Sequence, residues 1–217
     1  RVAAGAVAKA LLSRAGVTVL AFTRRLGEIE MQSFEQAEIE RNPFLCPDPR
    51  AAEQMARHVA EVKAAGDSLG GIVEIRAQGV PAGLGEPVFD KLDADLARAL
   101  MSIGAVKGVE IGSGFEASKM KGSGQNDPIF PEGFGSNHAG GILAGISNGE
   151  ELIMRVAVKP IPSIGLSQDT VDKHNRPTRI AVKGRHDIAA IPRINVVCEA
   201  MVWLVLADHF LRQQAIR

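Results

Sequence analysis

The 217-residue sequence predicts an α+β fold built on antiparallel sheet. About four helices and six strands are expected, with the helices grouped in pairs between pairs of strands. A doubly wound parallel sheet would need strict alternation of strands and helices, which this chain lacks. The sequence also contains no internal repeat. We therefore expect a single domain over residues 1–217.

Two helices are expected in the first third of the chain. Residues 2–15 are rich in Ala and Leu and stop at Gly16. Asp48 can cap a second helix that has Pro49 as its first residue and Gly66 at its end. The apolar face of this second helix is expected to consist of Ala52, Met55, Ala56, Val59 and Val62.

Two further helices are expected later in the chain. One follows the loop at 81–87, and its apolar side is expected to carry Phe89, Leu92, Leu96, Leu100 and Ile103. The other covers residues 194–212 and is apolar nearly all round, so it should lie inside the fold. Its most apolar stretch, 200–207, is too short to cross a bilayer, which takes about 20 apolar residues. A buried helix and no membrane partner are expected.

Strands are expected at residues 17–26, 72–78, 106–111 and 178–183. In 72–78 the side chains alternate, which predicts an apolar face and a face exposed to water that carries Glu74 and Arg76. Asn148-Gly149 lies between apolar runs at 142–146 and 152–159 and predicts a hairpin.

Two segments are expected to lack regular structure. Residues 112–135 are rich in glycine and show no periodicity, so they predict a long, flexible loop. Residues 168–177 are polar and predict a second loop.

Composition excludes several classes of function. The 25 basic and 25 acidic residues balance, which argues against nucleic-acid binding through bulk charge. Neither Cys46 nor Cys198 has metal-ligand spacing, and the histidines show no pairing, so no metal site is expected. No signal peptide is recognised, which favours a cytoplasmic location. The chain opens on Arg1 without a methionine, directly before an expected helix, and closes on Arg217 shortly after another, so both ends are expected to be internal to a longer protein.

The sequence contains no nucleophile-elbow, P-loop or Rossmann motif. The residues that could carry chemistry are cations in the last third of the chain. Lys159 ends an apolar strand before Pro160 and can meet a phosphate as a point charge, with Ser163 just beyond. The segment Arg185-His186-Asp187 lies in a loop between a strand and a buried helix, a position that favours function. The alternative for these residues is an exposed, solvated charge cluster.

Several segments, in order along the whole chain, resemble one enzyme family. They include GVPAGLGEPVFD at 79–90, SNHAGGIL at 136–143 and GRHD at 184–187. Further matches are residues 1–6, 42–49, 105–112, 158–160 and 199–201. By these segments the sequence resembles the chorismate synthase family. It is similar to the C-terminal portion of that family's larger catalytic domain.

The resemblance implies a lyase of the shikimate pathway, which serves aromatic amino-acid biosynthesis. It implies a 1,4-anti elimination of phosphate from 5-enolpyruvylshikimate-3-phosphate, giving chorismate, with reduced FMN as cofactor and NADP as an associated nucleotide. It also implies a cytoplasmic homotetramer. Each subunit would be a β-α-β sandwich, with a helical layer between two antiparallel sheets.

The resemblance also implies roles for individual residues. Asp187 matches an aspartate near the flavin N5 and is the catalytic candidate. The flavin contacts would be Gly104, Ala105, Ala144, Lys159, Pro160, Ile161, Pro162, Ser163 and Arg185. The small residues would allow close approach of the backbone, and the two cations would offset phosphate charge.

The chain departs from the family pattern at a few positions. Ile188 replaces the usual proline, Ile161-Pro162 replaces Thr-Ser, and Gly104 replaces a common asparagine. The family's two catalytic histidines and its arginine-rich phosphate pocket would lie upstream of Arg1. The alternative is therefore a non-catalytic FMN-binding or oligomerisation fragment that lacks the N-terminal half of the site. His138 is expected to have a structural role that shapes the hairpin, and His186 is expected to have either a positioning or a surface role.

Overall fold

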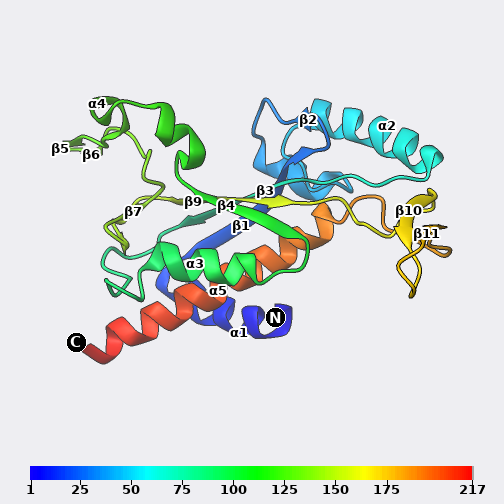
Figure 1. The fold of residues 1–217 in the computed structure, drawn as a ribbon. Helices are drawn as coiled ribbons and strands as arrows, with labels where there is room; N and C mark the ends of the chain where they lie inside the picture. The colour runs from blue at the N-terminus through cyan, green and yellow to red at the C-terminus, as the bar shows by residue number, and fades with distance from the viewer. Residues whose placement is uncertain (217) are drawn as a thin grey trace. The chain divides into compact units, whose positions relative to one another are not determined.

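The computed structural model describes residues 1–216 (Figure 1). The chain divides into two compact units. The first unit comprises Arg1–Phe22, Val73–Ala157 and Arg193–Arg217. The second comprises Thr23–Ile72 and Val158–Pro192. The single domain expected from the sequence stays a prediction.

The main sheet has five strands in the order β2-β1-β3-β9-β4. These strands are β1 (Thr18–Leu26), β2 (Ile29–Glu30), β3 (Gly71–Gln78), β4 (Val106–Ile111) and β9 (Leu152–Val158). β1 and β2 pair antiparallel. The three hairpins described below are antiparallel as well. Helices together with antiparallel sheets confirm the α+β class.

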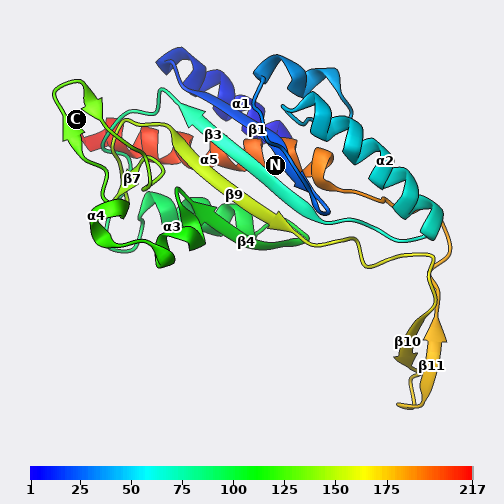
Figure 2. The same cartoon turned by 90° about the horizontal axis from the view of Figure 1, so that it is seen from above.

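In the first unit, three helices lie along one face of the strands (Figures 1 and 2). They are α1 (Val2–Leu12), α3 (Leu92–Met101) and α5 (Ile191–Ile216). A short 3-10 turn, η1 (Ser13–Ala15), continues α1 and ends at Gly16 with φ 82°. The core of this unit is made of buried side chains that include Ile75, Leu96, Leu100, Met154, Val156, Trp203 and Leu206.

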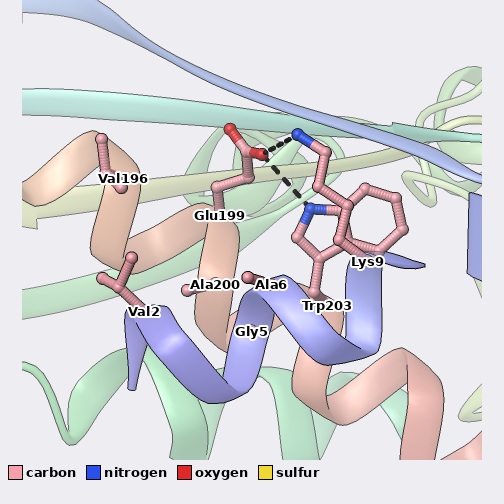
Figure 3. Close-up of a pocket in the computed structure, with 8 residues that line it drawn as sticks. All are labelled: Val2, Gly5, Ala6, Lys9, Val196, Glu199, Ala200 and Trp203. Carbon is pink, nitrogen blue, oxygen red and sulfur yellow. Dashed lines mark hydrogen bonds and ion pairs between the residues drawn. The ribbon is translucent and has the colours of Figure 1, made fainter. Parts of the chain in front are cut away.

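Helices α1 and α5 pack closely at Gly5, where a Cβ atom would lie 2.6 Å from the Cβ of Ala200. Beside this contact, the Glu199 carboxylate accepts hydrogen bonds from Lys9 and from the Trp203 indole, at 3.3 and 3.2 Å (Figure 3). A small pocket of about 170 Å³ remains in this groove. A glycine is therefore required where the two helix backbones approach each other.

Helix α5 is longer than expected, and its 26 residues are long and apolar enough to cross a membrane. Half of its most apolar window is nevertheless buried inside the fold. Its His209 makes a buried contact of 3.0 Å with the Asp95 carboxylate of α3. Those contacts are typical of a core helix, as the sequence predicted.

In the second unit, α2 (Pro49–Ala65) begins and ends where the sequence predicted. The Asp48 carboxylate accepts hydrogen bonds from four backbone N–H groups, those of Gln32, Ser33, Arg50 and Ala51. Burial alone would raise the pKa of Asp48, but these bonds hold it below its ordinary value. The expected apolar face is wrong at Ala56, which is exposed. Burial of this helix is confined to Ala51, Ala52 and Met55 near its start.

The face of β3 that was expected to meet water is exposed at Gln78 and half-buried at Arg76, but it is covered at Glu74. Glu74 is only 1% exposed, and its carboxylate pairs with Arg76 at 2.8 Å and with Arg155 of β9 at 3.8 Å. Arg155 also pairs with Glu110 of β4 at 3.2 Å. A carboxylate can be buried when neighbouring cations balance its charge. The polar residues that alternate along β3 therefore belong to a network of ion pairs.

The predicted Asn-Gly hairpin is wrong, and a shorter one forms just before it. β7 (Ile142–Leu143) pairs with β8 (Ile146–Ser147) around Ala144-Gly145. Both turn residues have positive φ, 52° and 84°, as a two-residue type I′ turn requires. The run at 152–159 could not serve as the partner strand because β9 belongs to the main sheet.

Residues 112–135 contain more regular structure than expected. They form the 3-10 helix η3 (Gly114–Lys119), the short α4 (Gly122–Gln125), and a hairpin of β5 (Ile129–Phe130) with β6 (Gly133–Phe134). These short elements are held by local hydrogen bonds and not by a buried apolar face. Apolar periodicity in the sequence therefore could not predict them. The flexibility of this segment stays a prediction.

Two further expectations are corrected. Phe89 precedes α3 and is 91% exposed, because that helix begins only at Leu92. Residues 168–171, expected in a loop, form β10 (Gln168–Val171), which pairs with β11 (Pro177–Ile180). All residues of these two strands are exposed, so the hairpin has no buried apolar face that would appear as an alternating pattern in the sequence.

The second unit also contains the 3-10 helix η2 (Gln36–Arg41).

Candidate functional site

The predicted flavin contacts fall into two groups, one in each unit. Gly104, Ala105 and Ala144 belong to the first unit. The second unit holds Lys159, Pro160, Ile161, Pro162, Ser163 and Arg185, together with the catalytic candidate Asp187. Each group has a local geometry that can be described by itself.

In the second unit, residues 68–70 join the two predicted segments. The Ser68 hydroxyl donates to the Ile161 carbonyl at 2.7 Å. The backbone N–H of Leu69 donates to the carbonyl of Ile188, also at 2.7 Å, and Leu69 forms an isolated parallel bridge with Ala189. The segment 159–163 and the residues that follow Asp187 are therefore held on the same short stretch of chain.

Gly70 makes this junction possible. A Cβ atom at Gly70 would lie 2.5 Å from the carbonyl oxygen of Val158 and 2.9 Å from Cδ of Pro160. The start of the predicted flavin segment thus packs directly on the Gly70 backbone. The sequence analysis missed residues 68–70, although the pair Gly70-Gly71 between a helix end and a strand was a signal of close packing.

The charged side chains of this group are accessible. Arg185 lies 4.0 Å from the Asp187 carboxylate, and their side chains are 84% and 37% exposed. An ion pair that is this open contributes about 0–1 kcal/mol, so an anionic ligand can compete for Arg185. Lys159 is also exposed. His186 makes a 2.8 Å contact between its ring Nε2 and the Val182 carbonyl, in keeping with a positioning role.

In the first unit, two of the predicted contacts have strained backbones. Ala105 has φ 70° and Ala144 has φ 52°. Among residues 1–216, the non-glycine residues with positive φ are Leu45, Ala105, Ala144 and Asn175. Such conformations cost on the order of 1–3 kcal/mol and are concentrated at functional sites. Gly104, next to Ala105, faces open space, since a Cβ atom there would meet nothing within 4 Å.

These residues nevertheless lie at opposite ends of α3. The Gly145 carbonyl next to Ala144 accepts a hydrogen bond of 2.8 Å from the N–H of Leu92, the first residue of the helix. Gly104 and Ala105 follow the last turn of the same helix, which is about 15 Å long for its ten residues. The first unit therefore does not bring its three predicted contacts together in one cluster.

The structure shows no arrangement suited to a metal ion in its described part. Within residues 1–216, no group of three or more His, Cys, Asp or Glu side chains could hold one. Cys198 is buried, which raises the pKa of its thiol to about 12 and leaves it unreactive.

Comparison with known proteins gives one consistent result. A family model described as chorismate synthase matches residues 1–211. The chain is 65% identical over 216 residues to a chorismate synthase of Desulfosudis oleivorans, covering 100% of this chain and 61% of that protein. It is 58% identical over 217 residues to a chorismate synthase of Desulfatibacillum aliphaticivorans, with the same coverage of each chain.

A solved structure gives the same result at the level of the fold. A crystal structure of chorismate synthase is similar to this chain with a TM-score of 0.81 and 35% sequence identity. The alignment covers 97% of this chain and 62% of the other. The chain thus spans about three fifths of the length of the relatives that it matches.

Proposed function

Since the chain belongs to the chorismate synthase family, we propose that the full-length protein is an FMN-dependent lyase. It converts 5-enolpyruvylshikimate-3-phosphate to chorismate by a 1,4-anti elimination of phosphate. The observation that carries the proposal is the junction at 68–70, which joins the segment of Lys159 to the segment of Arg185 and Asp187. A cytoplasmic homotetramer of the shikimate pathway is part of the same proposal.

The chain's residues fit reduced FMN in charge and in shape. Lys159 and Arg185 are exposed cations in one unit, as the phosphate of FMN requires. Ala105 and Ala144, at opposite ends of α3, each have a positive φ and a small side chain, which leaves the main chain accessible to a ligand at each place. When bound, reduced FMN would supply the electron that weakens the carbon–oxygen bond to phosphate.

The remaining chemistry belongs to the protein. Asp187 takes up or returns a proton at the flavin N5, a role that its partly exposed carboxylate can fill. Arg185, 4.0 Å from that carboxylate, contacts the flavin or its phosphate. Pro160 and Pro162 restrict the backbone directly after Lys159, which limits the directions in which the chain can leave that residue.

Two departures from the family pattern are compatible with this assignment. The Ile161 carbonyl is the group that Ser68 binds, so this contact does not depend on the side chain at 161. Ile188, which replaces a proline, uses its own carbonyl to accept from Leu69. A backbone carbonyl is common to both residue types, so the junction tolerates the exchange.

The flavin assignment predicts that Lys159 and Arg185 bind FMN through charge. In the full-length protein, Lys159→Met and Arg185→Met are each expected to raise the Kd for FMN about tenfold or more, because a charge-assisted hydrogen bond is lost. The matched control is Arg179→Met, whose guanidinium pairs with Asp169 in the exposed β10–β11 hairpin. Fluorescence titration of FMN measures all three. Equal affinities in all three variants would remove both cations from the flavin site.

A further inference from the structure

A buried carboxylate in the first unit organises a segment that the proposed function has not used. The side chain of Asp127 is only 2% exposed. It accepts hydrogen bonds from the Ser136 hydroxyl at 2.6 Å and from the backbone N–H groups of His138 and Ala139 at 2.7 and 2.9 Å. The His138 ring Nδ1 lies 3.3 Å from the same carboxylate. We call these four residues the Asp127 clasp.

The Asp127 clasp lies at the end of an excursion of the chain, residues 113–138, which leaves the fold after β4 and returns before β7. The two ends of this excursion are bonded to each other. The Ser113 N–H at its start donates to the His138 carbonyl at its end, at 2.7 Å. Gly112 packs so closely there that a Cβ atom would lie 2.1 Å from that carbonyl oxygen. Asn137 donates to the Glu151 carbonyl at 2.8 Å and so ties the exit to the start of β9. Backbone and side-chain hydrogen bonds therefore hold the point where the excursion leaves and rejoins the fold.

The same exit leads directly into the hairpin that carries Ala144. The Asn137 side-chain oxygen accepts from the Gly141 N–H at 2.7 Å, immediately before β7. A cavity of about 680 Å³ lies between the clasp and this hairpin. Its lining consists of Gln125, Asn126, Asp127, Pro128, Ile129, Ala139 and Leu143. The hollow is open to solvent, since Asn126, Pro128, Ile129 and Leu143 are exposed, and Leu143 is the neighbour of Ala144.

One polar group at this cavity has no partner within the fold. The side-chain oxygen of Gln125 is buried and accepts no hydrogen bond from any group in residues 1–216. A buried acceptor without a donor is costly, and native proteins keep few of them. This oxygen is a second indication that the cavity takes a ligand with a donor group.

We propose that Asp127 is a positioning residue for the cofactor. Asp127 holds the backbone N–H groups of His138 and Ala139, which lie between Asn137 and β7. It thereby sets the place of the β7–β8 hairpin, and hence of the backbone contact at Ala144. The inference rests on the proposed function, because it takes Ala144 as a flavin contact. Asp127 itself lines the cavity wall and does not touch the reacting atoms.

The chemistry of the clasp requires a carboxylate. Three donors converge on the two oxygens of Asp127, and an ionised carboxylate is the short side chain that offers only acceptors. Burial favours the neutral acid, but the hydrogen bonds from Ser136, Ala139 and His138 outweigh it and lower the pKa of Asp127. The stabilisation is therefore complete above about pH 4 and is lost as the pH falls through the lowered folded value.

The test compares Asp127→Asn with Asp169→Asn in the full-length protein. Asparagine at 127 would direct an NH₂ group at backbone donors, whereas Asp169 is an exposed residue of the β10–β11 hairpin. For Asp127→Asn we expect the Kd for FMN to rise about tenfold and protease cleavage within 113–138 to accelerate. At saturating FMN, kcat should return to within about threefold of the wild type, since no reacting group was changed.

The outcomes separate this inference from the proposed function. Wild-type protein that does not bind FMN overturns the proposed function. If the wild type binds FMN and Asp127→Asn binds it equally well, the positioning role is overturned, whatever happens to the melting temperature. A kcat that stays depressed at saturating FMN overturns it as well, because Asp127 would then act in the reaction itself.

Discussion

Asp187→Asn in the full-length protein is expected to lower turnover by about 10²–10⁴-fold while the Kd for FMN changes by less than about threefold. Asparagine has nearly the shape of aspartate, so contacts with neighbouring backbone survive. It cannot accept and return a proton. The carboxylate is 4.0 Å from Arg185 and partly exposed, so a bound ligand can reach it.

Steady-state kinetics at saturating reduced FMN, together with FMN titration, measure the two quantities separately. Asp172→Asn is the control, since Asp172 only accepts backbone hydrogen bonds within the turn at His174 and Arg176. It should leave turnover within about threefold of the wild type. Unchanged turnover in Asp187→Asn would remove Asp187 from the mechanism, and a parallel loss of FMN binding would make it a binding residue.

Gly85→Ala is expected to be the most destabilising single change near the hairpin of Ala144. Gly85 has φ 127°, and a Cβ atom there would lie 2.1 Å from the carbonyl oxygen of Gly145. That oxygen cannot move freely because it accepts the Leu92 N–H at the start of α3. Strain and overpacking together should lower the free energy of unfolding by about 3 kcal/mol or more.

Gly83→Ala separates the two causes. Gly83 lies in the same loop with φ 98°, but a Cβ atom there would meet only the Gln213 side chain, at 3.9 Å. Backbone strain alone should cost it about 1–3 kcal/mol. Urea unfolding of both variants gives the difference, which measures the contact with Gly145. Equal losses would contradict the close approach of these two backbones.

The sequence predicted the elements whose signals are local. Helix α2 was found from its capping Asp48, its Pro49 and its terminal Gly66, all of which act within one turn. The hairpin was placed wrongly because Asn148-Gly149 is a strong turn signal, whereas the choice of partner depends on β9 joining the main sheet. Glu74 was expected in water because its alternation does not reveal Arg155, which comes from another strand.

The candidate site follows the same rule. The resemblance placed Lys159, Arg185 and Asp187 in two segments, but the residues that join those segments lie far away in sequence. Ser68 and Ile161 are 93 positions apart, and no spacing rule connects them. Asp127 was missed because its partners are backbone N–H groups, which every residue carries and which leave no mark on the sequence.

We propose that the full-length protein containing this chain is a working chorismate synthase. The decisive experiment adds 5-enolpyruvylshikimate-3-phosphate and reduced FMN to the full-length protein without oxygen. We expect chorismate and inorganic phosphate in equal amounts with no net oxidation of the flavin, and no turnover by the 217-residue chain alone. Full-length protein that binds FMN but forms no chorismate would contradict it and favour a non-catalytic flavin-binding module.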